Sequence, residues 1–343
     1  MNEFDFIKKI RQRAQERGPS AGLVRGIGDD AAVLKSFLGT DIVISSDLLV
    51  EDIDFRRDTT QPNLLGHKAL AVSLSDIAAM GARPRWSLLS LGVPEGVWSS
   101  GFVDAFYDGF FKLAQRYGVT LIGGDVSRTP EKVVIDSIVI GECRLDHAIL
   151  RSGAQPGDQL FVTGALGDAA AGLRLLERGA RLHPEAMKQP DAISAEPNSV
   201  DHLLLRHLRP DARVGWGLLL GDKQLATAMI DISDGLSSDL NHLCGESKVG
   251  AMIDAARIPI NHVVTELCGR RALDPLMLAL HGGEDFELLF SVKSENVAKL
   301  PWRVDGVSLT RIGEITEPVE GIRIAEGSKI WNLEPGGWEH FKG

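Results

Sequence analysis

Residues 228–240 read AMIDISDGLSSDL, an apolar run followed by two aspartates set among serine and glycine. The run from Ala228 to Ile232 predicts a buried strand, and the polar DG and SSDL after it predict a strand-to-helix turn. Open α/β sheets bind their ligands at the ends of strands. We therefore expect Asp231 and Asp234 to lie where a ligand binds.

Aspartates beside glycine or serine recur next to other apolar runs. They are Asp29 and Asp30 in GIGDD, Asp47 in VISSD, Asp76 in SLSDIAAMGA, Asp125 in LIGGD and Asp285 in HGGED. So many carboxylates in one place would repel one another unless cations lay between them. Oxygen ligands select Mg²⁺ or Ca²⁺, and Mg²⁺ usually arrives with phosphates. Asp and Gly are also common in turns, but the number of these motifs favours a magnesium-phosphate enzyme.

Length and composition limit the remaining possibilities. The 343 residues are enough for two domains with their own cores, and a hydrophobic content of 44% is ordinary for a soluble protein. The net charge of −10 argues against a nucleic-acid-binding surface. Cys143, Cys244 and Cys268 lack the spacing of a disulfide framework or a zinc site. No apolar run reaches the length of a membrane span, so we expect a cytoplasmic protein without a membrane partner.

The predicted elements mix helices and strands without strict βαβ alternation, which favours an α+β fold. Helices are predicted at residues 4–17, 62–80, from 99 or 100 to 117, 168–177 and 234–244, and strands at 41–46, 86–93, 119–122, 133–143, 159–163, 226–233, 285–292 and 309–316. The glycines and proline of LRSGAQPGD predict a junction. We therefore expect a first domain over residues 1–149 and a second over residues 150–343. The polar stretch 178–210, broken by prolines, has no clear role.

Several common site motifs are excluded. GIGDDA is similar to a dinucleotide fingerprint, but no apolar strand precedes it and its two aspartates would repel a pyrophosphate. The chain has no P-loop, protein-kinase, G-x-S-x-G or H-E-x-x-H motif. A calcium-binding module would need EF-hand spacing, which is absent. The nine histidines show no ligand spacing and are expected to be ordinary polar positions.

Each candidate ligand also has a structural explanation. Ser45, Ser46 and Asp47 offer adjacent oxygens that suit Mg²⁺, but they also suit a cap for the next segment. Asp76 lies on a predicted apolar helix, where a buried carboxylate is costly unless it meets a cation. Asp125 follows two glycines that allow close approach to a phosphate. Asp234 serves equally well as the N-cap of the following helix.

Seven motifs, taken together and in order, resemble those of the thiamine-monophosphate kinase family. They are GIGDDAAVL, SSDLLVEDIDF, GHKALAVSLSDIAAMGARP, LIGGDVSR, RSGAQPGD, AMIDISDGLSSDL and GGEDFELLF, and GGWEHF is similar to the family's C-terminal tail. The resemblance covers nearly the whole chain. It implies kinship with aminoimidazole ribonucleotide synthetase, selenophosphate synthetase and the hydrogenase-maturation dehydratase. It also implies two α+β domains, the second with a mixed sheet and helices, and a homodimer whose N-terminal strands form a barrel across the two-fold axis.

The resemblance carries site roles onto matching positions. It implies Mg²⁺ ligands at Asp30, Ser45, Ser46, Asp47, Asp76, Asp125, Asp231 and Asp234. It implies ATP contacts at Tyr107, Gly124, Arg151 and Ser233, and substrate contacts at Asp54, Glu284 and Trp338. The choice of Glu284 over Asp285 stays open at this point. For Trp338, simple packing of the C-terminus onto the core is the alternative.

The implied reaction is ATP-dependent phosphorylation of thiamine monophosphate to thiamine diphosphate, with several Mg²⁺ ions and direct in-line transfer. The acceptor is a phosphate monoester with a pKa near 6, so it needs no general base. Selenophosphate synthetase would need an N-terminal nucleophilic cysteine, but no cysteine precedes Cys143, and the hydrogenase-maturation protein would end in cysteine, whereas this chain ends in HFKG. Another enzyme of this superfamily or a metal-dependent phosphohydrolase remains the alternative.

Overall fold

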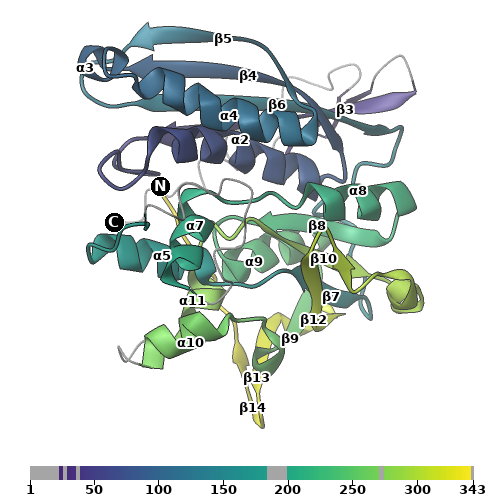
Figure 1. Cartoon of the computed structure of the whole chain (residues 1–343). Helices are drawn as coiled ribbons and strands as arrows, with labels where there is room; N and C mark the ends of the chain where they lie inside the picture. Colours follow the sequence, from purple (N-terminus) through teal and green to yellow (C-terminus); the bar gives the residue numbers. More distant parts are fainter. Residues whose placement is uncertain (1–22, 26–28, 36–38, 184–198, 270–273, 341–343) are drawn as a thin grey trace.

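The computed structural model describes residues 23–25, 29–35, 39–183, 199–269 and 274–340. Within these ranges each half of the chain builds one β-sheet, and helices lie between the sheets and beyond the second one (Figure 1). The helix predicted at 4–17 lies outside the described residues, as does 184–198 of the polar stretch.

The first half forms a six-stranded sheet in the order β1-β2-β3-β6-β4-β5. Its strands are β1 (Leu23–Arg25), β2 (Ala32–Lys35), β3 (Thr40–Val50), β4 (Arg83–Val93), β5 (Thr120–Arg128) and β6 (Val134–Arg144), and its helices are α2 (Pro62–Ala79), α3 (Glu95–Trp98) and α4 (Phe102–Tyr117). Neighbouring strands are antiparallel except β4 and β5, which are parallel. A parallel pair needs a crossover connection, and α3 and α4 provide it.

Among the described residues, helices cover one face of this sheet and leave the other uncovered. Val43, Ile135 and Val139 point to the covered face and join a core with residues of α2 and α4. On the opposite face, Leu48 is 60% exposed and Trp86 40% exposed. Successive side chains of a strand alternate between faces, so one chain leaves an apolar sheet surface open to its surroundings.

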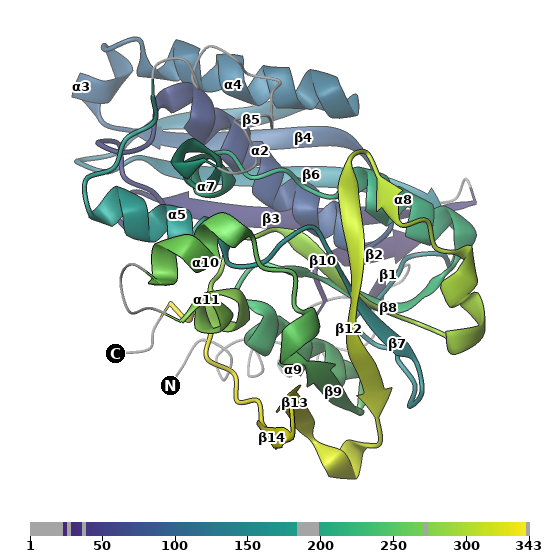
Figure 2. The ribbon, with the colours of Figure 1, turned by 60° about the horizontal axis from the view of Figure 1, so that its bottom comes forward.

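Helix α2 is buried on all sides. It packs against β3 and β6, against α4, and against α8 and β8 of the second half (Figures 1 and 2). The prediction of a helix at 62–80 is confirmed to within one residue. Neither α2 nor any other helix in the described ranges is long and apolar enough to cross a membrane.

The second half forms an eight-stranded sheet in the order β14-β13-β9-β12-β7-β10-β8, with β11 paired to β12. Its strands are β7 (Gln159–Thr163), β8 (Ala226–Ile232), β9 (Gly250–Asp254), β10 (Glu287–Val292), β11 (Arg303–Val304), β12 (Val307–Thr316), β13 (Ile322–Glu326) and β14 (Lys329–Asn332). Its helices are α5 (Asp168–Glu177), α7 (Val200–Leu208), α8 (Val214–Lys223), α9 (Leu236–Ser247), α10 (His262–Gly269) and α11 (Pro275–His281), with short 3₁₀ turns η1 (Ala255–Arg257), η2 (Ser294–Lys299) and η3 (Pro318–Glu320). One face packs on α9 and α11, and the other on α8 and Ala79 of α2.

The mixed α/β fold with two sheets is therefore confirmed, with corrections to two strands. The strand predicted at 41–46 continues to Val50, because LLV stays paired to β6, so Asp47 lies inside a strand and not after one. The strand predicted at 119–122 continues to Arg128 beside β4, so Asp125 also lies inside a strand. Within the described residues the first sheet has two open edges, β1 and β5, and does not close into a barrel.

Helices α2 and α4 cross at Gly66 of α2 and Gly109 of α4, where their backbones lie close together. A substitution at Gly66 tests this crossing. A Cβ added at Gly66 would lie 1.8 Å from the carbonyl oxygen of Phe106. Gly66→Ala should therefore destabilise the protein by about 1–3 kcal/mol, in spite of alanine's better helix propensity. Gly245→Ala, at an exposed position of α9 with no atom within 4 Å of the new Cβ, should stabilise it by roughly 0.5–1 kcal/mol. Denaturant unfolding measures both, and equal effects would show that the crossing tolerates a side chain.

Candidate active site

Three carboxylates from different parts of the chain meet between the two sheets. Asp30 precedes β2, Asp76 lies near the end of α2, and Asp231 lies at the end of β8. One oxygen from each lies within 4.8 Å of the others. Asp30 and Asp231 are buried, and Asp76 is half-buried. The cluster thus joins residues of both halves of the chain.

Serine hydroxyls hold these carboxylates in place. Ser75 Oγ donates to Asp231 Oδ2 at 2.6 Å. Ser45 Oγ, on the neighbouring strand β3, donates to Asp76 Oδ2 and lies 3.5 Å from Asp47 Oδ2. Ser75 and Asp76 are consecutive residues of α2, so one turn of this helix contacts both β8 and β3. Ser45 and Asp47 therefore belong to the cluster.

The electrostatics of the cluster favour a bound cation. Burial, together with repulsion from Asp47 and Asp231, raises the pKa of Asp76 well above its usual value. Burial and the nearby Asp30 raise the pKa of Asp231 in the same way. Burial raises the pKa of Asp47 to about 6. Carboxylates crowded together out of water are stabilised in their charged form by a metal or another cation.

Arg151 supplies one such cation. Its Nε and Nη2 atoms donate to the two oxygens of Asp30 at 3.1 and 2.9 Å, a bidentate pair. Its backbone N–H donates to Asp29 Oδ1 at 3.2 Å, and Asp29 also accepts from Arg25 Nε at 2.9 Å. Arg151 lies in the connection between β6 and β7. The segment that connects the two halves thus places an arginine beside the aspartates.

The donor set fits a hard divalent cation. It consists of three carboxylates within 4.8 Å, with the hydroxyl of Ser45 and the carboxylate of Asp47 beside them. These are all oxygen donors, without the nitrogen or sulfur that would favour zinc. Oxygen sets of this kind suit Mg²⁺ or Ca²⁺.

Two predicted metal ligands lie elsewhere in a single chain. Ser46 points to the opposite face of β3, where its Oγ donates to Asp136 Oδ1 at 3.0 Å. Asp125 lies on the edge strand β5, and the register runs from Leu48 through Asp136 and Ser90 to Asp125. Three strand spacings amount to about 14 Å. The alternation of faces within a strand separates Ser46 from its neighbours Ser45 and Asp47.

Asp234 lies in the turn that follows β8, but it does not cap α9. The N-cap residue is Gly235. Asp239, inside the helix, accepts from the backbone N–H groups of Asp234 and Gly235 at 3.2 and 3.0 Å through its Oδ2. The N-cap position of α9 thus lies one residue after Asp234, and Asp239 holds the backbone of the turn before the helix.

The four predicted ATP-binding residues do not lie together within a single chain. Arg151 contacts the aspartate cluster, and Ser233 lies two residues beyond Asp231. Gly124 lies on the edge strand β5. Tyr107, half-buried on α4, stacks on Phe111 with ring centroids 5.7 Å apart.

Two of the three predicted substrate residues lie against the turn after β8. The backbone N–H of Glu284 donates to the carbonyl of Ser233 at 2.7 Å, and that of Trp338 donates to the carbonyl of Asp234 at 3.1 Å. Trp338 is 55% exposed, so only part of it packs against the protein. Asp54 Oδ2 accepts from the backbone of Val50 at 2.7 Å.

The structure separates the roles of Glu284 and Asp285. Asp285 is fully buried, and its carboxylate accepts from the backbone N–H groups of Gly167 and Ala169 at 2.7 and 3.2 Å. It therefore caps the first turn of α5 and is not available to a ligand. Glu284 keeps 29% of its side chain exposed and pairs with Lys68 and His207.

Some residues of the site carried no signal in the sequence. Asp136 and His207 stand in ordinary strand and helix patterns, and only the fold brings them next to Ser46 and Glu284. Ser75 was visible as part of SLSD, but nothing in the sequence indicated its contact with Asp231, 156 positions away.

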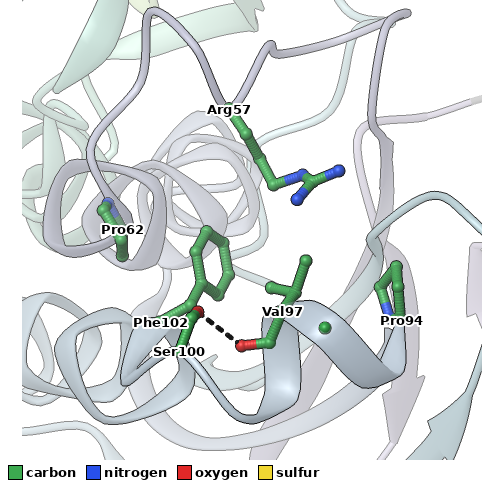
Figure 3. A pocket seen from close by; sticks show the side chains of 7 residues that line it. Arg57, Pro62, Pro94, Val97, Ser100 and Phe102 are labelled. Atoms are coloured by element: carbon green, nitrogen blue, oxygen red, sulfur yellow. Dashed lines mark hydrogen bonds between the residues drawn. The ribbon is translucent and has the colours of Figure 1, made fainter.

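A separate hollow lies outside the aspartate cluster, between the loop of Arg57 and the start of α4. A cavity of about 500 Å³ is lined by Arg57, Pro62, Pro94, Gly96, Val97, Ser100 and Phe102, so none of the predicted site residues lines it (Figure 3). The guanidinium of Arg57 extends from its loop opposite Val97, and Ser100 Oγ donates to the carbonyl of Val97 at 2.7 Å.

Comparison with known proteins decides the family. The models for the AIR synthase related protein match at residues 28–143 for the N-terminal domain and 155–325 for the C-terminal domain. Thiamine-monophosphate kinase of Bacillus subtilis (strain 168) is 38% identical over 347 residues, covering 100% of both chains. The chain belongs to the thiamine-monophosphate kinase family.

Further members of the family agree along nearly their whole lengths. Thiamine-monophosphate kinase of Escherichia coli (strain K12) is 37% identical, covering 99% of this chain and 98% of the relative. The solved structure described as AaThiL complexed with AMPPCP and TMP superposes with a TM-score of 0.82 at 32% identity, covering 99% of this chain and 97% of that one. This kinase family therefore shares the arrangement of the two sheets.

Proposed function

We propose that this chain transfers the γ-phosphoryl group of ATP to thiamine monophosphate, giving thiamine diphosphate and ADP. The family supports the reaction, since its members carry that name and one was solved with AMPPCP and TMP. The observation that carries the proposal is the meeting of Asp30, Asp76 and Asp231 beside Arg151. Carboxylates that can hold hard cations, next to an arginine, form a receptor for a triphosphate.

The proposed metal ligands are Asp30, Ser45, Asp47, Asp76, Asp231 and Asp234. Bound Mg²⁺ would neutralise the phosphate charges that otherwise keep the two anionic substrates apart. Arg151 would bind the nucleotide phosphates, because its guanidinium already lies among the aspartates. Ser233 would contact the nucleotide from the turn after β8. We also propose a domain boundary near residue 150, which agrees with the gap between the two family models.

Helix α2 separates the proposed binding places of the two substrates. Asp76 and Lys68 are eight residues apart, so they lie on similar sides of the helix and about 12 Å apart along its axis. We place the triphosphate at the Asp76 end. The thiamine part of the acceptor is placed at the other end, among Asp54, Glu284 and Trp338.

The chemistry requires no general base. An oxygen of the acceptor phosphate bonds to the γ-phosphorus while the bond from that phosphorus to the β–γ bridging oxygen breaks, and ADP leaves with that electron pair. The acceptor is largely dianionic at neutral pH, so no proton has to be removed first. What the chain contributes is binding and orientation of two polyanions in line.

We propose that the active form is a homodimer joined through the open face of the first sheet. Leu48 and Trp86 lie exposed on this face, and β5 is an unpaired edge strand exposed along its length. Open apolar sheet surfaces are usually covered by a partner, and a two-fold axis lets the same surface cover itself. Ser46 and Asp125 carry ligand oxygens on this side, so we propose that these residues and Gly124 act together with the second subunit. Tyr107 is proposed to meet the nucleotide base.

The first prediction concerns the metal and the acceptor. ADP formation should require both Mg²⁺ and thiamine monophosphate, and EDTA should abolish it, because the aspartates alone repel ATP. Asp76→Asn should lower kcat by at least about a hundredfold, on the order of an electrostatic contribution to catalysis. Asp108→Asn, at an exposed position of α4, should leave it unchanged. A coupled ADP assay measures each; equal ADP formation without the acceptor would identify a phosphohydrolase instead.

The second prediction concerns recognition of the thiazolium ring. If Trp338 stacks on this cation, Trp338→Ala should raise KM for thiamine monophosphate by roughly two- to thirtyfold, the range of a cation–π contact. KM for ATP and the Tm should barely change, since the indole is more than half exposed. Trp302→Ala is the matched control, because Trp302 is 73% exposed and its ring faces the guanidinium of Arg303. A lower Tm with an unchanged KM would show that Trp338 only packs.

The third prediction concerns assembly. Light scattering at micromolar concentration should give about twice the chain mass of 37.1 kDa. Leu48→Arg should produce monomers and abolish activity, because it places a charge in the middle of the proposed interface. Val319→Arg, at a position 93% exposed in the second half, should leave both mass and activity unchanged. An active wild-type monomer would exclude the shared site.

A further inference from the structure

Lys68 is a buried cation in the middle of α2. Its residue is 1% exposed, and its Nζ lies 2.6 Å from Glu284 Oε1. The same Nζ donates to the backbone carbonyl of Asp54 at 3.4 Å. A lysine is almost never fully buried unless it is paired. One ammonium group of α2 thus contacts both the turn that carries Glu284 and the loop that carries Asp54.

The carboxylate of Glu284 is held on both oxygens, and its backbone is held separately. Lys68 binds Oε1, and Nδ1 of His207, on α7, lies 2.8 Å from Oε2. The backbone of Glu284 has a φ of 65°, a conformation that a residue with a side chain rarely adopts, and its N–H donates to Ser233. Such strain persists where the surroundings over-determine the conformation, and it gathers at ligand sites. The orientation of this carboxylate is therefore imposed by tertiary contacts.

The neighbours of Glu284 set its ionic state. Although burial opposes ionisation, Lys68 and His207 lower the pKa of Glu284 to about 2, so it is a carboxylate at neutral pH. Burial raises the pKa of Asp54, and Glu284 raises it further, whereas His340 and Lys68 lower it. Lys68 thus lies between the carboxylate of Glu284 and the backbone of Asp54, with His207 and His340 as the other titratable groups nearby. The partly exposed Glu284 carboxylate can face an organic cation such as a thiazolium ring.

We propose that Lys68 is a positioning residue for the acceptor, which fixes the Glu284 carboxylate and the Asp54 loop as the two walls of the thiamine pocket. This inference rests on the proposed function. Buried ion pairs add little net stability compared with apolar residues of similar size, so stability alone does not account for a buried lysine here. The exposed part of Glu284 leaves room for a ligand on the carboxylate that Lys68 orients.

A role of Lys68 in positioning Glu284 and a purely electrostatic role predict opposite changes in KM for the acceptor when the ammonium group is removed. If Lys68 acted only through its charge, Lys68→Met would make the pocket more negative, and KM for the cationic acceptor would fall. If Lys68 orients Glu284, the same change would release the carboxylate, and KM would rise. The direction of the change in KM therefore separates the two roles.

The experiment compares Lys68→Met, Lys68→Arg, Glu284→Gln and the double variant Lys68→Met/Glu284→Gln. We expect Lys68→Met to raise KM for thiamine monophosphate by about tenfold, within the range of coupling between contacting residues. KM for ATP should stay within about twofold in the same assay, because Asp76 and Arg151, which are proposed to hold the triphosphate, lie at the other end of α2. Lys68→Arg should recover most of the loss, since it restores a cation. Lys223→Met, at an exposed position of α8, is the control and should behave as wild type.

The double variant decides whether Lys68 acts through Glu284. Its KM should equal that of Glu284→Gln alone, because there is then no carboxylate left to orient. It also avoids an uncompensated buried charge, so it is informative even if Lys68→Met alone does not fold. A further rise in KM over Glu284→Gln, or a fall in KM for Lys68→Met, would overturn the inference while the proposed function stands. A wild-type protein without acceptor-dependent ADP formation would overturn the proposed function first.

Discussion

Burial of α2 between the two sheets is the constraint on which the rest of the structure depends. The helix has no solvent-facing side to hold polar groups, so its lysine, serines and aspartate must find partners inside the protein. Each of them does, and the partners lie on different elements: Glu284 for Lys68, the carbonyl of Ser137 for Ser73, Asp231 for Ser75 and the hydroxyl of Ser45 for Asp76. The packing of one helix thus assembles the polar site.

The same packing creates a charge problem that the chain alone solves only in part. Two of the carboxylates have a cation beside them: Arg151 neutralises the charge of Asp30, and Lys68 neutralises that of Glu284. Asp76 and Asp231 differ, because burial and the neighbouring carboxylates raise their pKa values and so disfavour their charged forms. A protein keeps such a cluster at a cost in stability, and clusters of this kind are typical of functional sites.

The sheet of the first half adds a second constraint, because its strands present different chemistry on their two faces. Ser45 faces α2 and Asp76, whereas the next residue, Ser46, faces Asp136 on the open side. Adjacent residues of one motif therefore belong to opposite sides of the sheet. Candidate ligands that are consecutive in the sequence therefore point to different sites in the structure, because alternate residues of a strand face opposite sides.

The sequence by itself determined the class of fold, the limits of α2, α5 and β7, and the identity of the carboxylates, because apolar periodicity and turn residues are local signals. It also brought Asp30, Asp76 and Asp231 into one prediction, because each follows the same local pattern. Only the tertiary structure decided that Asp285 caps α5, that Glu284 meets Lys68 and His207, and that Asp125 lies about three strands from β3. These depend on strand register and on contacts between distant segments, and no local pattern of residues encodes such contacts.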